Sequence, residues 1–151
     1  ICCVRRLEKH HRLLLISNIN AIHCPWIFRT YPEFGYFKHS VLSYQVGVLK
    51  PKPGIYQHAI NTYQLHPSNT FYIDDQPQNI ETGKSFGFQC WHYELTHHGA
   101  FEQWLDQVLA ETWTANPYIQ SHELMNSIEL LRSFMQFESN PGSDLLFQTR
   151  G

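Results

Sequence analysis

The sequence lacks long apolar runs. Its longest aliphatic stretch is LLLI at 13–16, far short of the roughly 20 residues that a membrane-spanning helix needs. The first residues also lack the pattern of a signal peptide. These absences argue against a membrane protein, and we predict a soluble, cytoplasmic protein without a membrane partner.

Cysteines are few and lack the spacing of a zinc site. None of them forms a Cys-x-x-Cys pair, and they lie at positions 2, 3, 24 and 90. With His23 and His92 they would give poor tetrahedral geometry. We therefore expect buried or unreactive thiols.

A concentration of charge of one sign is also missing. The 11 Lys and Arg residues are scattered, and the net charge is −2 with neutral histidines, which argues against a nucleic-acid surface. The 151 residues are 42% hydrophobic. That is enough for one domain with a packed core.

Short apolar segments alternate with helical patterns along residues 1–111. Strands are predicted at 13–16, 39–47, 70–73 and 88–93, and helices at 54–65, 77–87 and 96–111. Strands and helices that alternate at this spacing indicate parallel βαβ units. We predict an α/β fold with a Rossmann-like, three-layer parallel sheet.

The composition changes after this segment. Residues 112–151 are predicted to form a linker, an amphipathic helix capped by Ser121, and a loose tail. We expect the apolar face of that helix to pack on its own protein, and a site for a partner helix is the alternative.

Polar side chains follow the apolar runs at three points. Ser17 and Asn18 come first, Lys50 precedes a predicted helix, and Asp74 and Asp75 follow the third strand. The carboxyl ends of parallel strands share one edge, so these groups could form one site. Hydroxyl, amide and ammonium groups suit phosphate oxygens, and carboxylates suit magnesium. Together they indicate phosphoryl transfer, although each piece alone is also typical of a turn or a solvated side chain.

Three segments resemble motifs of the haloacid dehalogenase-like (HAD) hydrolases. LLLISN is similar to motif II, VGVLKPKPGIYQHAI to motif III, and FYIDDQPQNIETGKSFGF to motif IV. They appear in the order of the family and cover roughly residues 7–95. Receiver domains use similar residues, but their acid pair comes first in the chain.

The resemblance implies how the site would bind phosphate. Ser17 would bind the transferring phosphoryl group, with Asn18 beside it. Lys50 would be the catalytic lysine that neutralises the phosphate. The family commonly has an acid where this chain has Lys52, which we expect to be solvated.

The resemblance also implies a magnesium site. Asp74 would ligate Mg²⁺, Asp75 would bind it directly or through water, and Asn79 would brace the loop. An acid pair at this position is similar to the phosphatase branch, which implies a magnesium-dependent phosphatase. We expect it to act on a small phosphorylated metabolite through an aspartyl-phosphate intermediate.

One motif of the family is missing from the sequence. Motif I, an apolar strand followed by Asp-x-Asp, supplies the nucleophile, and the only other aspartates are Asp106 and Asp144, in a predicted surface helix and the tail. We therefore expect the carboxy-terminal part of a phosphatase, without its cap domain, poorly stable and inactive alone. The alternative is a non-catalytic module that binds a metal or a partner.

Overall fold

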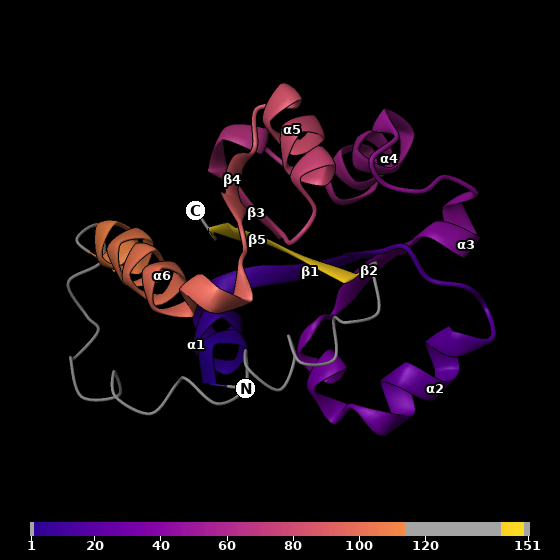
Figure 1. Ribbon diagram of the computed structural model, residues 1–151, viewed down its shortest axis with the longest axis horizontal. Helices are drawn as coiled ribbons and strands as arrows, with labels where there is room; N and C mark the ends of the chain where they lie inside the picture. Colours follow the sequence, from indigo (N-terminus) through magenta and orange to yellow (C-terminus); the bar gives the residue numbers. More distant parts are fainter. Residues whose placement is uncertain (1, 114–142, 150–151) are drawn as a thin grey trace.

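The computed structural model describes residues 2–113 and 143–149, and they build an α/β fold around one five-stranded sheet (Figure 1). The strand order is β2-β1-β5-β3-β4. The strands are β1 His11–Ser17, β2 His39–Leu42, β3 Thr70–Asp74, β4 Gln89–His92 and β5 Ser143–Thr149. β1 pairs with β2 and β3 with β4 in parallel, whereas β5 is antiparallel to both of its neighbours.

Helices cover both faces of the sheet. α4 and α5 lie on one face, and α1 and α6 lie on the other (Figure 1). The α-helices are α1 Cys2–His10, α2 His23–Thr30, α3 Ser43–Val46, α4 Pro53–Tyr63, α5 Pro77–Ser85 and α6 His98–Trp113. Short 3-10 helices lie at Pro32–Tyr36, Pro67–Asn69 and Leu95–His97. The three-layer arrangement of the prediction is confirmed.

The strand β1 contributes to the hydrophobic core on both faces. Leu13 and Leu15 pack in the cluster beneath α1 and α6, and Leu14 and Ile16 pack in the cluster beneath α4 and α5. Successive side chains of a strand point to opposite faces. The continuous apolar run is therefore that of a strand buried on both sides.

The second strand is shorter than predicted. It ends at Leu42, and residues 43–46 form α3. The Ser43 hydroxyl accepts a hydrogen bond from the Ile19 N–H and donates to the Ile19 carbonyl, which holds the turn against the loop after β1. Gly47 follows in the left-handed region with φ of 74°, a conformation that glycine adopts without steric cost.

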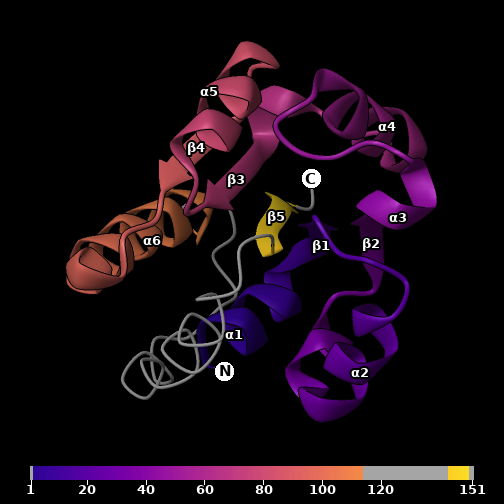
Figure 2. The same cartoon turned by 45° about the vertical axis from the view of Figure 1, so that its right-hand side comes forward.

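The prediction of a loose tail is wrong for residues 143–149, which form β5. Figure 2 shows this strand between β1 and β3. Without β5, the facing edges of β1 and β3 would carry unpaired N–H and C=O groups. Pairing with β5 satisfies these groups. The predicted amphipathic helix lies outside the described residues, and the division into segments 1–111 and 112–151 stays a prediction.

No described helix has the length and hydrophobicity required to cross a bilayer. Cys24 is buried and Cys90 half-buried, and both are free thiols.

Candidate active site

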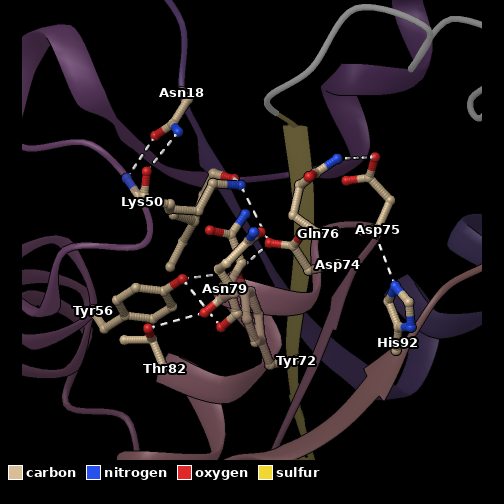
Figure 3. Close-up of polar contacts among 12 residues, drawn as sticks. Asn18, Lys50, Tyr56, Tyr72, Asp74, Asp75, Gln76, Asn79, Thr82 and His92 are labelled. Atoms are coloured by element: carbon tan, nitrogen blue, oxygen red, sulfur yellow. Dashed lines mark hydrogen bonds and ion pairs between the residues drawn. The ribbon is translucent and has the colours of Figure 1, made fainter.

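The first part of the site is the end of β1. Ser17 is the last residue of the strand and is buried. The amide of Asn18, the next residue, is joined to the main chain of Lys50 at both ends (Figure 3): Oδ1 accepts from the Lys50 N–H at 2.8 Å, and Nδ2 donates to the Lys50 carbonyl at 3.0 Å. Asn18 thus ties the loop after β1 to the segment that precedes α4.

The Lys50 side chain runs inward from this segment. Its ammonium donates to the Ile16 carbonyl at 3.2 Å and lies 3.5 Å from Asp74 Oδ2. Lys50 therefore connects the carboxyl ends of β1 and β3, which the sequence pattern predicted to share one edge. Lys52 is exposed. Pro53 is the first residue of α4, a position where a backbone N–H would have no partner within the helix, so the proline costs no hydrogen bond.

Asp74 ends β3 and is 2% exposed. Its Oδ1 accepts from the Gln76 N–H at 2.7 Å, and its Oδ2 accepts from the Tyr72 hydroxyl. Burial raises the pKa of Asp74 above the usual 3.8, while Lys50 and the hydrogen bonds to its carboxylate lower it. The pKa of Asp74 is raised overall, because the loss of hydration outweighs the effect of Lys50 and of the hydrogen-bond donors.

Asp75 is the more accessible acid of the pair. Its side chain is half-buried, and Oδ2 accepts from Gln76 Nε2 at 3.0 Å. Its carbonyl oxygen lies 3.0 Å from Nε2 of His92, at the end of β4 (Figure 3). A carbonyl can only accept, so His92 Nε2 carries the proton in this contact.

Asn79 lies on α5 and is buried. Its side chain forms a hydrogen bond that lowers the pKa of Asp74. Its carbonyl oxygen lies 3.3 Å from the Tyr56 hydroxyl, which is also 3.2 Å from the Tyr72 hydroxyl. Sequence reasoning missed the two tyrosines, because a tyrosine among apolar residues is typical of a core. It considered His92 only as a zinc ligand, whereas the structure places it on the Asp75 carbonyl.

The acid pair offers part of a metal site. Carboxylate oxygens are the ligands that magnesium prefers. Across residues 2–113 and 143–149, no group of three or more His, Cys, Asp or Glu side chains could hold a metal ion. Magnesium usually keeps several waters and binds phosphate oxygens, so the donors fit as part of its shell. Asp74 is buried among its protein partners, and Asp75 is the more accessible of the two carboxylates.

Comparison with protein families gives a match over most of the motif-bearing segment. Residues 2–87 match the family model described as haloacid dehalogenase-like hydrolase. A curated relative, D-ribitol-5-phosphate phosphatase of Bacteroides thetaiotaomicron, is 34% identical over 106 residues, which cover 60% of this chain and 50% of the relative. The chain spans about half the length of that relative.

The chain is also similar to solved structures of HAD family enzymes. A HAD family enzyme of Bacteroides thetaiotaomicron superposes with a TM-score of 0.58 and 26% identity, over 61% of this chain and 48% of that chain. The magnesium complex of the enzyme from that organism gives a TM-score of 0.57 and 28% identity, over 64% of this chain and 53% of that chain. A complex with magnesium and inorganic phosphate gives a TM-score of 0.57 and 25% identity, over 61% of this chain and 50% of that chain.

Proposed function

Because the chain belongs to the haloacid dehalogenase-like hydrolases, we propose that it forms part of a magnesium-dependent phosphatase that acts on a small phosphorylated metabolite. The observation that carries the proposal is the buried contact between Lys50 and Asp74, which joins two strand ends beside the half-buried Asp75. The phosphatase named among the relatives, and the relative bound to magnesium and phosphate, support the same reaction class.

Each group at the edge has a proposed role. Lys50 neutralises charge on the phosphate oxygens, and the Ser17 hydroxyl donates to one of them. Asn18 keeps the Lys50 main chain in place. A magnesium ion, when bound, would neutralise further phosphate charge, with Asp75 as a ligand and Asp74 beside it. Fixed charges of this kind stabilise phosphoryl transfer mainly by positioning and neutralisation.

The covalent step requires an aspartate other than these two. We propose that an aspartate attacks phosphorus, that the bond to the leaving alcohol breaks, and that water then releases inorganic phosphate from the aspartyl-phosphate. The 151 residues contain no apolar strand followed by Asp-x-Asp. We therefore expect residues 1–151 alone to lack turnover, and the complete gene product to supply the nucleophile.

The test measures hydrolysis of an aryl phosphate and of D-ribitol 5-phosphate by the complete gene product, with and without magnesium. We expect magnesium-dependent release of phosphate that falls at least 100-fold in Lys50→Ala and in Asp74→Asn. Unchanged rates in both variants would refute the assignment of the site. Absence of hydrolysis by the wild-type product would instead favour a non-catalytic module.

A further inference from the structure

The buried carboxylate of Asp74 has a partner that the proposed reaction does not use. Tyr72 precedes Asp74 by two residues on β3, so both side chains lie on the same face of the strand. The Tyr72 hydroxyl donates a hydrogen bond to Asp74 Oδ2, the oxygen nearest to the Lys50 ammonium. Tyr72 is 0% exposed. The hydrogen bond therefore forms without competition from water.

In the hydrogen bond between Tyr72 and Asp74, the tyrosine hydroxyl is the donor. An ionised carboxylate only accepts, so the single proton of Tyr72 points to Asp74. The Tyr72 oxygen lies 3.2 Å from the Tyr56 hydroxyl, which can donate to it or to the Asn79 carbonyl at 3.3 Å. Helices α4 and α5 are thus linked to Asp74 through two hydroxyl groups (Figure 3).

The ring of Tyr72 has little room to move. Gly83 of α5 lies so close that a Cβ atom there would be 2.5 Å from Tyr72 Cδ1. The rings of Tyr56 and Phe88 lie against it, with centroids at 5.6 and 6.1 Å. A hydroxyl on a ring packed in this way is held in one position, and so is the carboxylate oxygen that it contacts.

We propose that Tyr72 is a positioning residue, whose hydroxyl holds Asp74 Oδ2 beside Lys50 and so leaves Asp75 to bind the cation. The proposal rests on the proposed function and adds a residue that acts through Asp74. Without the hydroxyl, the Asp74 carboxylate can rotate away from Lys50. The Lys50 ammonium and the loop that begins at Asp74 and Asp75 would then lose their fixed positions.

The experiment replaces Tyr72 by Phe in the complete gene product, which removes one oxygen atom and retains the ring. We expect kcat for the aryl phosphate to fall about tenfold, as for the loss of one hydrogen bond to a charged group. The magnesium concentration for half-maximal rate should rise at least threefold, and KM for the ester should change less than twofold, because Tyr72 does not touch the substrate. Calorimetric titration with magnesium alone should show the same weakening.

Tyr63→Phe is the matched control. The Tyr63 hydroxyl donates to the Ser40 carbonyl at 3.0 Å and is outside this network. Its loss likewise removes one tyrosine hydroxyl and its hydrogen bond, so kcat and magnesium dependence should stay at wild-type values. If Tyr72→Phe does not fold, Gly83→Ala provides the second test, because the added methyl group displaces the Tyr72 ring and should also raise the magnesium requirement.

The outcomes separate the two proposals. An active wild-type enzyme whose Tyr72→Phe variant has unchanged kcat and magnesium dependence would overturn the role of Tyr72 and leave the proposed function standing. If the wild-type protein has no hydrolase activity, the magnesium titration decides: weaker binding by Tyr72→Phe than by Tyr63→Phe supports the positioning role. Equal binding, or no binding by any of the proteins, overturns it.

Discussion

The Lys50 ammonium lies 3.5 Å from Asp74 Oδ2, and neither side chain has any exposed surface. Each charge has lost its hydration and depends on the other for compensation. The Ile16 carbonyl, the Gln76 N–H, the Tyr72 hydroxyl and the Asn79 side chain also contact the pair. Removing either partner would therefore leave the other charge buried without compensation.

Replacing Lys50 by Met should lower the free energy of unfolding by about 3 to 5 kcal/mol, because the Asp74 carboxylate would remain buried without its cation. Urea denaturation at neutral pH measures this change. Lys52→Met is the matched control on an exposed lysine two residues away, and we expect a change within about 0.5 kcal/mol. Equal losses in the two variants would contradict the importance of the pair.

The stability of the protein should depend on pH through Asp74. Burial raises its folded-state pKa above the usual 3.8, so the folded state binds more protons than the unfolded chain between these two values. The free energy of unfolding should therefore fall as pH rises from about 3.8 toward the folded-state pKa. Below this range both states are protonated, and the cost of burying the charge is absent.

Asp74→Asn isolates the contribution of Asp74 titration to the free energy of unfolding, because the asparagine side chain cannot ionise. The stability of the wild-type protein relative to Asp74→Asn should decrease with rising pH across the same range, as measured by urea denaturation at a series of pH values. A relative stability that increases with pH would show that the pKa of Asp74 is lowered rather than raised.

Gly83→Ala should destabilise the protein by about 1 to 3 kcal/mol, because the added methyl group meets the Tyr72 ring at 2.5 Å. Thermal or urea denaturation measures the loss. Gly99 of α6 has no atom within 4 Å of the Cβ position. Gly99→Ala should therefore leave stability unchanged or raise it by up to about 1 kcal/mol, and a loss equal to that of Gly83→Ala would exclude a steric cause.

Asn18→Ala should lower both stability and the hydrolysis rate of the complete gene product. It removes the two hydrogen bonds that hold the Lys50 main chain, and we expect a loss of about 1 to 3 kcal/mol and a rate reduced about tenfold. Asn20→Ala is the control. The Asn20 side chain accepts from the N–H groups of Ile22 and His23, so its loss should lower stability by about 1 kcal/mol without changing the rate.

The strand ends of the site could be predicted from sequence, because the pattern that marks the end of a strand involves only neighbouring residues. An apolar run followed by a polar residue marks the end of a buried strand, which placed Ser17 and Asp74 correctly at the ends of β1 and β3. Lys50 could be placed by its position before α4. Its hydrogen bond to the Ile16 carbonyl depends on how the segments pack, which spacing alone does not specify.

Tyr72 and β5 were missed for different reasons. A tyrosine in an apolar strand is typical of a core residue, and only the structure shows its hydroxyl on Asp74. The strand β5 is separated from its partners by a long stretch of chain and runs antiparallel. Such non-local pairing leaves no periodic signal that distinguishes a strand from a tail. The predicted site residues are Ser17, Asn18, Lys50, Asp74, Asp75 and Asn79, and the roles of all of them toward a ligand stay predictions.

The burial of the Lys50 side chain should make it unreactive toward amine-modifying reagents in the folded protein. Amine-acylating reagents require a solvent-accessible, uncharged lysine, so the folded protein should be labelled at Lys52 and spared at Lys50, two residues earlier. Any opening of the sheet edge would expose Lys50 to the reagent as well. The ratio of the two modified peptides would thus report directly on the closure of the site, without a substrate.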